Sequence, residues 1–404
     1  MKILLLCNKS PWPPREGGPM AMHMIISGLI SAGHEVKVLA INSNKFFTSV
    51  ESIPTDFRRD TGIEFEYIDL SIKPLQALKH FILGTSYHVE RFISENFQAR
   101  LRKILSENSF DIIQLETLFM APYIPLIRQK SQAAIILRAH NIEHRIWKRI
   151  SESSKNPLKK IYLQHVWKSL KRYEIKQLGN FDGIAAITKA DAAFFEGENR
   201  GPEVHAISFG IEMNDQTLEK CTEKKNSVFH IGSMDWMPNQ EGIQWFLKNV
   251  WPRVISQNPE LVLYLAGRNT PSWLINKKQE GVEIVGEVED AGVFMRQHQL
   301  MVVPLLSGSG IRIKIIEGMA NARAIVTTKI GAEGIAYTSG ENLYIAENEE
   351  DFAKKILLLA GNDELREKTG EKALELLHQK HNKRELIRDL IAFYKSCLTK
   401  KNGR

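Results

Sequence analysis

The sequence predicts an α/β protein with two Rossmann-like, doubly wound domains in tandem. Short apolar runs rich in β-branched residues alternate with amphipathic stretches in both halves of the 404-residue chain. Apolar runs that alternate with helices indicate parallel strands buried on both faces of a sheet. A chain of this length also exceeds one ordinary domain, so two domains are the natural expectation.

In the first half, the runs that predict strands are KILLLCN, HEVKVLAI, IEFEYIDL, DIIQLET, AAIILRAHN and FDGIAAIT. Amphipathic stretches at 20–32 and 97–108 predict helices between them. The second half repeats this scheme with SVFHIGS, LVLYLAG, VEIVGEV, LMVVPLL, AIVTT and NLYIAEN. A helical stretch from about 363 to 398 closes the chain without a further strand.

The boundary between the halves is predicted from the stretch 212–226, which is polar, charged and without an apolar period. Such a composition is typical of a linker. We therefore expect an N-terminal domain at 1–205 and a C-terminal domain at 206–384. The C-terminal helix, about 385–404, is a candidate to pack back on the first domain.

Two doubly wound domains in tandem are expected to face a central cleft. In such sheets, ligands bind beyond the carboxyl ends of the strands, where helix N-termini converge. Both halves have a glycine-rich loop after comparable strands, at 17–18 and at 307–310. A shared cleft is therefore favoured over two unrelated sites.

Composition excludes several classes of protein. The chain is 43% apolar and 25% charged, which is ordinary for a globular protein. No stretch approaches the ~20 apolar residues that span a bilayer, and the apolar run near the N-terminus is too short for a signal sequence. Three scattered cysteines indicate a reducing compartment and no metal site. We expect a cytoplasmic protein.

Positive charge is concentrated in one segment. Between residues 128 and 176 there are thirteen Lys or Arg against three Glu and no Asp, whereas the net charge of the whole chain is +7. Clustering of one sign concerns binding partners and not folding. The segment is either a solvated basic face or a surface for an anionic partner. Nucleic acid is not expected, because too few aromatic residues are interleaved to form a stacking platform.

The stretch SGSGIRIKIIEGMANARAIVTT (307–328) predicts a site for a phosphorylated ligand. It places a glycine-rich turn between the strand LMVVPLL and a helix that starts near Ile311. Exposed N–H groups at a helix start bind anions, and Arg312 and Lys314 add positive charge there. Glu317, one turn further, is placed to accept hydrogen bonds from a ribose. The alternative is a plain helix cap with a Lys314–Glu317 surface pair.

The first loop, KSPWPPREGGPMAMHMI, has Gly17 and Gly18 just before a predicted helix. This pair suits a second approach to phosphate or sugar, although a plain turn fits equally well. The dinucleotide fingerprint G-x-G-x-x-G is absent from this loop, so a nicotinamide-dependent dehydrogenase is disfavoured.

These features together resemble the retaining glycosyltransferases of family 4 (glycosyl transferases group 1), which have the GT-B fold. The resemblance covers nearly the whole chain. It is strongest in FHIGSMDWMPNQEGIQWFLKNVWPRV, LYLAGR, VEIVGEV and VVPLLSGSGIRIKIIEGMANARAIVTTKIGAEGI. It implies retaining transfer of a hexose from a nucleotide-diphosphate sugar, a UDP- or GDP-sugar, to a hydroxyl group. The implied acceptor is a glycan or lipid-linked glycan in cell-surface polysaccharide biosynthesis.

The chain departs from the family pattern at two points. The family has two glutamates eight positions apart; Glu317 matches the second, but Ser309 stands at the first. The family also has Gly-Arg after the first strand of the C-terminal domain and a Lys about eight residues later. Here these positions hold Gly232-Ser233 and, near the second, Glu241. We expect Arg312 and Lys314 to replace the missing cations.

The resemblance also assigns the remaining site residues. His140, in LRAHNIEHR, follows a strand and would contact the donor sugar or assist at the reacting centre, with Glu143 and Arg145 after it on the loop. The expected catalytic residues are His140, Glu317, Arg312 and Lys314. The expected donor-binding residues are Gly17, Gly18, Gly232, Ser233, Gly267, Arg268, Gly286, Ser307, Gly308, Ser309 and Gly310. No D-x-D sequence occurs, so a metal that holds the diphosphate is not expected. No cofactor is expected either.

Two other functions stay open at this point. One is a GT-B-fold isomerase or epimerase of nucleotide sugars, and the other is a non-catalytic partner that binds a sugar nucleotide. The acceptors of bacterial members of the family are frequently lipid-linked. The basic segment, 145–176, is therefore a candidate to hold the protein peripherally at the anionic inner face of the membrane.

Overall fold

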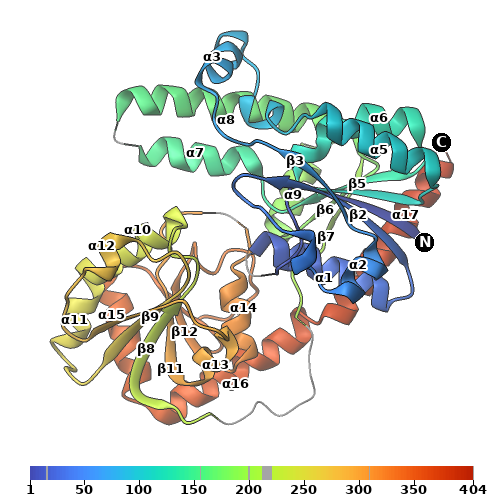
Figure 1. Ribbon diagram of the computed structural model, residues 1–404. Helices are drawn as coiled ribbons and strands as arrows, with labels where there is room; N and C mark the ends of the chain where they lie inside the picture. The colour runs from blue at the N-terminus through green and yellow to red at the C-terminus, as the bar shows by residue number, and fades with distance from the viewer. Residues whose placement is uncertain (15–16, 155, 199–200, 212–220, 309, 404) are drawn as a thin grey trace. The chain divides into compact units, whose positions relative to one another are not determined.

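The computed structural model describes residues 1–14, 17–154, 156–198, 201–211, 221–308 and 310–403. The chain forms two compact units (Figure 1). Unit 1 comprises Met1–Phe209 and Lys383–Arg404, and unit 2 comprises Gly210–Asn382. Each unit contains one parallel sheet with helices on both faces, which confirms the predicted doubly wound α/β architecture.

The sheet of unit 1 has the strand order β3-β2-β1-β4-β5-β6-β7. Its strands are β1 (Lys2–Cys7), β2 (Glu35–Ser43), β3 (Glu64–Ile68), β4 (Ile112–Glu116), β5 (Ala134–Ala139), β6 (Gly183–Ala186) and β7 (Glu203–Ala206). All but β7 correspond to predicted runs. The short β7 was not predicted because its residues EVHA lie at the sheet edge, are only partly buried and lack an apolar run.

The helices of unit 1 are α1 (Gly17–Ser31), α2 (Thr55–Thr61), α3 (Pro74–Leu83), α4 (Tyr87–Glu90), α5 (Glu95–Glu107), α6 (Ile124–Lys130), α7 (Glu143–Ser153), α8 (Pro157–Gln177), α9 (Lys189–Gly197) and α17 (Lys383–Asn402). The helices predicted at 20–32 and 97–108 are α1 and α5. Helices α7 and α8 lie side by side as a long hairpin (Figure 1). Over the ranges that the structure describes, no helix has the length and apolarity needed to cross a membrane.

The C-terminal helix α17 packs on unit 1. It lies so close to strand β6 that a Cβ atom on Gly183 would be 2.6 Å from Sγ of Cys397. The helical stretch predicted at 363–398 consists of two helices, because α16 (Asp363–Lys380) ends before α17 begins. At the break, the N–H of Ile211 donates to the carbonyl of His381 (3.0 Å), next to an isolated β-bridge between Ile211 and Asn382, so this carbonyl does not accept a bond from a continued helix.

The sheet of unit 2 has the order β10-β9-β8-β11-β12-β13. Its strands are β8 (Lys224–Ile231), β9 (Val262–Ala266), β10 (Val282–Gly286), β11 (His298–Val303), β12 (Ala324–Thr328) and β13 (Tyr344–Ala346), all of them predicted. Part of the predicted linker, 212–220, lies outside the described residues. Its end was placed too late, because β8 already begins at Lys224, whose N–H donates to the carbonyl of Gln297 (2.8 Å).

The helices of unit 2 are α10 (Met237–Trp245), α11 (Trp251–Ile255), α12 (Ser272–Ile275), α13 (Ala291–Arg296), α14 (Ile313–Ala320), α15 (Glu349–Ala360) and α16. Trp251 is fully buried among Phe246 and Phe352 on one side of the sheet. Helix α10 follows β8, and α14 follows β11. Since β8 and β11 are neighbours in the sheet, both helices start at the same edge.

Candidate active site

Three predicted donor-binding glycines end neighbouring strands of unit 2. Gly232 follows β8, Gly267 follows β9 and Gly286 ends β10. The N–H of Gly267 donates to the carbonyl of Gly286 (2.6 Å), so two of these turns are joined directly. Gly267 has φ +151°, and a Cβ atom there would lie 1.7 Å from the carbonyl oxygen of Gly232. Only glycine fits at Gly267, because the backbones of these turns approach each other closely.

Lys314 extends from the first turn of α14 over the Gly232 turn. Its Nζ donates to Oδ1 of Asn239 (2.9 Å) and lies 3.4 Å from Nε2 of His230. A Cβ atom on Gly232 would be only 2.3 Å from this Nζ. Asn239 is held in turn by the carbonyl of Ser233, to which its Nδ2 donates (2.7 Å). The ammonium group of Lys314 thus lies directly against the Gly232 turn at the end of β8.

The surroundings of Lys314 weaken its hold on a proton. Burial, and next the neighbouring Arg312, lower the pKa of Lys314 to about 7. His230 Nδ1 donates to the carbonyl of Val302 (2.9 Å), and burial and Lys314 lower the pKa of His230. His230 is therefore neutral, and its Nε2 lone pair faces the ammonium. An anion placed here would draw Lys314 back to its charged form.

Glu317 lies one turn beyond Lys314 and is half-buried. Burial raises its pKa to about 7, while Lys314 acts in the opposite direction. Within the described part of the chain, its carboxyl group forms no hydrogen bond and no ion pair within 4.0 Å. The structure therefore does not contain the Lys314–Glu317 surface pair that was the alternative prediction. A desolvated carboxyl group remains one helical turn from a cation.

Arg312 is the N-cap residue of α14, which begins at Ile313, two residues after the start predicted near Ile311. It is buried, and its Nη1 donates to the carbonyl of Gly310 (2.9 Å). Its guanidinium carbon lies 5.6 Å from the ring centroid of Trp236. Arg312 thus braces the loop before α14. Ser309, in the same loop, lies outside the described residues.

The other predicted polar residues of unit 2 brace turns at the same edge. The hydroxyl of Ser307 donates to Oε2 of Glu241 (2.5 Å). Glu241 stands near the position at which the family has a Lys. Ser233 donates to Oδ1 of Asp235 (2.9 Å), and the carbonyl of Arg268 accepts the N–H of Met234 (2.8 Å). These contacts fix the shape of the edge.

In unit 1, His140 follows β5 and contacts a buried carboxyl group. Its Nε2 lies 2.6 Å from Oε2 of Glu116, the last residue of β4; the His140 side chain is 11% exposed and that of Glu116 is 0% exposed. Gln114 Nε2 donates to Oε1 of Glu116 (2.5 Å). The hydroxyl of Tyr394, on α17, donates to Oε1 of Gln114. A line of buried hydrogen bonds therefore runs from the C-terminal helix to His140.

Two further residues lie next to these buried hydrogen bonds. Arg138 lies directly across from Glu116 in the β4–β5 register and is fully buried. Burial lowers the pKa of Arg138, and Glu116 opposes that shift by supplying the opposite charge. Thr117, next to Glu116, has φ +81°. A β-branched residue in this conformation is strained, and such strain clusters at functional sites.

The residues after His140 have a structural role. The backbone N–H groups of Glu143 and His144 donate to the Glu174 carboxylate of α8 (3.1 and 3.3 Å), and His144 Nδ1 lies 2.5 Å from it. Glu174 thereby caps the start of α7. The predicted loop position of Glu143 and Arg145 is wrong, because both lie in α7. Burial and then Glu174 raise the pKa of Glu143 to about 8.

The remaining predicted pair, Gly17 and Gly18, opens α1 after strand β1 in unit 1. A Cβ atom on Gly18 would lie 2.9 Å from Cε of Lys9. This pair belongs to a different unit from the glycines at the ends of β8, β9 and β10. Glu116, Asn239 and His230 were not predicted as site residues from the sequence. Glu116 had one signal, since it is a charged residue at the end of an apolar strand run.

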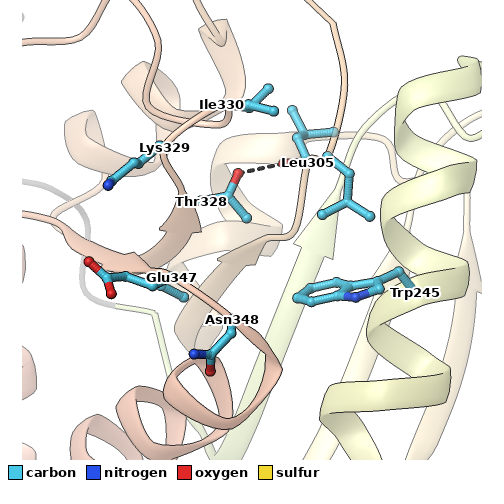
Figure 2. A pocket seen from close by; sticks show the side chains of 9 residues that line it. Trp245, Leu305, Thr328, Lys329, Ile330, Glu347 and Asn348 are labelled. Carbon is cyan, nitrogen blue, oxygen red and sulfur yellow. Dashed lines mark hydrogen bonds between the residues drawn. The ribbon is translucent and has the colours of Figure 1, made fainter. Parts of the chain in front are cut away.

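A separate hollow of about 370 Å³ lies beside the carboxyl ends of β11, β12 and β13 (Figure 2). It is lined by Trp245, Leu305, Leu306, Thr328, Lys329, Ile330, Ala346, Glu347 and Asn348. Thr328 donates its hydroxyl to the carbonyl of Leu305, and Asn348 caps α15. Its polar groups are thus partly used by the fold, and no described residue of the predicted site lines it.

Comparison with known proteins identifies the domain that carries the glycine edge. Residues 225–362 match the family described as Glycosyl transferases group 1. The match lies within unit 2 and shows that this part of the chain is similar to group 1 glycosyltransferases. The matched range contains Gly232, Lys314 and Glu317. We conclude that the chain is a glycosyltransferase.

The similarity to one relative of this glycosyltransferase extends beyond that domain. An uncharacterized 44.6 kDa protein in the cps region of Klebsiella pneumoniae is 24% identical over 89% of this chain and 91% of the relative. An uncharacterized glycosyltransferase of Methanocaldococcus jannaschii is 32% identical over 26% of this chain and 30% of its own length.

Solved structures agree with the GT-B fold of this glycosyltransferase. Sucrose-phosphate synthase from Thermosynechococcus elongatus has a TM-score of 0.71 at 13% identity, covering 99% of this chain and 100% of the other. HepE from Anabaena in complex with UDP has a TM-score of 0.67 at 14% identity, covering 98% and 100%. At these identities the likeness shows the fold alone.

Proposed function

We propose that this glycosyltransferase moves a sugar from a nucleoside-diphosphate sugar to a hydroxyl group of an acceptor. The observation that carries the proposal is the Lys314 ammonium, which lies over the Gly232 turn and donates to Asn239. A cation beside backbone N–H groups at a helix start suits a diphosphate. Similar proteins, HepE from Anabaena and the pneumococcal transferase GtfA, were solved with UDP. A UDP-sugar is therefore the first donor to test, and a GDP-sugar the second.

Transfer proceeds with retention of the anomeric configuration and without a metal ion, as the resemblance to family 4 implies. The acceptor oxygen bonds to the anomeric carbon on the face from which the diphosphate leaves, and the acceptor proton passes to the departing phosphate. Catalysis then consists of positioning and electrostatic stabilisation. Lys314 compensates the leaving group, Arg312 holds the loop beside it, and Glu317 accepts hydrogen bonds from the ribose. EDTA is expected to leave the rate unchanged.

His140 contacts the donor sugar or assists at the reacting centre. Its hydrogen bond to Glu116 supports this role, because a buried carboxylate fixes the orientation of the imidazole. Gly17 and Gly18 at the start of α1, with Gly267, Gly286 and the loop 307–310, complete the proposed contacts with the donor.

The acceptor is a glycan or a lipid-linked glycan in the synthesis of a cell-surface polysaccharide. The similarity to a protein in a cps region supports this class of acceptor. The basic segment, 145–176, then holds the enzyme peripherally at an anionic membrane surface. Its helix α8 exposes Lys159, Lys160, Lys168, Lys171, Arg172 and Lys176.

A thermal-shift screen with UDP-, GDP-, ADP- and CMP-sugars tests the donor, because specific binding raises the melting temperature. The donor that binds is then incubated with and without acceptor. Transfer only in the presence of acceptor supports the proposal. Conversion of the donor into another nucleotide sugar without acceptor would instead indicate an isomerase, and binding without any reaction a non-catalytic partner.

A further inference from the structure

Helix α3 carries a large apolar surface that the fold of unit 1 leaves uncovered. None of its ten residues is buried. Leu75, Leu78 and Ile82 are 83%, 55% and 74% exposed, and at this spacing they share one face of the helix. Ile72 and Leu83 at its two ends are 67% and 61% exposed. Isolated exposed apolar side chains are common, whereas a contiguous group on one short helix marks an interaction site.

The inner side of α3 is fixed to α8. The ring of Phe81 lies 4.5 Å from that of His165, and Nη2 of Arg172 donates to the carbonyl of Gly84 (3.0 Å). Gly84 has φ +68° and ends the helix in the left-handed conformation. In Figure 1, α3 projects from unit 1 next to α8. The helix is therefore held in place, with its apolar face directed away from the contacts with α8.

The apolar surface continues onto α8. Leu158 and Ile161 are 78% and 57% exposed. They precede His165 and Arg172 at helical spacing, so all four lie along the same side of α8. Since His165 and Arg172 contact α3, the exposed start of α8 lies on the same side as α3.

The charge around this surface is mainly positive; one acidic residue beside α3, Asp69, lies 3.8 Å from Nζ of Lys73. Helix α3 contains Lys79 and no acidic residue, and the residue before it is Lys73. On α8, the exposed charged residues are all Lys or Arg, because its one acidic residue, Glu174, is buried beneath the start of α7. Exposed aliphatic side chains bordered by cations are complementary to a bilayer with anionic headgroups.

We propose that α3 and the start of α8 insert their apolar side chains into the interface of an anionic lipid bilayer. The choice of partner rests on the proposed function, in which segment 145–176 docks on a membrane, whereas the apolar surface stands on the exposure of α3 itself. The cations attract the protein, and the aliphatic side chains of α3 keep it attached. Attachment therefore depends only in part on salt.

The test uses the full chain and vesicles of phosphatidylglycerol mixed with phosphatidylcholine. The variant Leu75→Gln/Leu78→Gln/Ile82→Gln is expected to bind vesicles at least tenfold more weakly than wild type, at low and at high salt. Its melting temperature should be unchanged, because these side chains are exposed. The matched control, Leu358→Gln, removes an apolar side chain that is 49% exposed on α15 and should bind like wild type.

A second measurement reports insertion directly. An environment-sensitive fluorophore on Leu78→Cys, in a Cys221→Ser background, should shift its emission to shorter wavelength when vesicles are added, whereas the same label on Leu358→Cys should not. Unchanged emission, or unchanged vesicle binding by the triple variant, would overturn the proposal. So would a wild-type dimer that the triple variant converts to a monomer, because a second copy would then cover the surface. Transfer to a soluble acceptor by the triple variant keeps this result separate from the proposed function.

Discussion

The Nε2 atom of His140 lies 2.6 Å from Oε2 of Glu116, a residue without solvent exposure. When Nε2 donates to the Glu116 carboxyl oxygen, the lone pair of the imidazole is on Nδ1. Within the described residues, Nδ1 has no hydrogen-bond partner. Glu116 therefore leaves His140 able to accept a hydrogen bond from a hydroxyl group. We infer that Glu116 is a positioning residue.

Replacing Glu116 by Gln should lower kcat by at least about tenfold, or about 1.4 kcal/mol in activation free energy, with a small change in KM. The amide keeps the shape of the side chain, but it can turn its NH2 group toward Nε2. The imidazole of His140 is then no longer held in one tautomer. Nitrogen NMR of the imidazole should show the Nε2–H form in wild type and a mixture in the variant.

The matched control for Glu116 is Glu143→Gln, which changes another buried carboxyl group of unit 1 that does not contact His140. It should keep its kcat. Equal kcat and the same tautomer in wild type and Glu116→Gln would show that the contact with His140 is only structural.

Binding of a nucleoside diphosphate should take up protons at pH 8. The pKa of Lys314 is lowered to about 7, so at pH 8 the free enzyme holds mostly the neutral amine. The diphosphate favours the ammonium and raises this pKa, so a proton enters from the buffer. Glu317, with a pKa of about 7, is already ionised at pH 8 and has no proton to release.

Calorimetric titrations in buffers of different ionisation enthalpy measure this proton uptake. Uptake should be close to one proton per site in wild type at pH 8 and absent in Lys314→Met. Affinity should fall as pH rises above 7. The same uptake in the variant would show that another group titrates and that Lys314 does not meet the diphosphate.

Gly232→Ala should weaken binding of the nucleoside diphosphate at least about tenfold. The new methyl group would lie 2.3 Å from Nζ of Lys314 and push this flexible side chain aside, so the melting temperature should change little. Gly179→Ala is the control, because a Cβ atom at Gly179 meets nothing within 4 Å. Equal affinity of Gly232→Ala and wild type would place the diphosphate away from β8.

Glu317→Ala should weaken binding of the nucleotide sugar and nearly abolish transfer without unfolding the protein. Its carboxyl group has no partner among the described residues, so its loss breaks no contact of the fold. Titration with a nucleoside diphosphate and with inorganic diphosphate separates the roles. Only the former should bind the variant more weakly, because inorganic diphosphate lacks the ribose. Unchanged affinity for the nucleoside diphosphate would remove Glu317 from the site.

The doubly wound folds could be predicted because buried parallel strands leave an apolar run that the sequence displays directly. The site could be predicted only where a residue type combines with a turn, as at Gly232 or Lys314. Glu116 and Asn239 were not predicted. The role of Glu116 depends on the neighbouring strand that carries His140, and the role of Asn239 depends on the path of the Lys314 side chain. Likewise, the cap that places Glu143 in α7 comes from Glu174, 31 residues later.

Hydrogen exchange measured by mass spectrometry, with and without the nucleotide sugar that binds, tests most directly where the donor lies. We predict slower exchange in residues 230–241 and 307–317, which hold Gly232, Asn239, Lys314 and Glu317. Residues 328–330 and 346–348, which line the separate hollow, should be unaffected. Protection of that hollow, with none at 230–241 and 307–317, would contradict the proposed donor site.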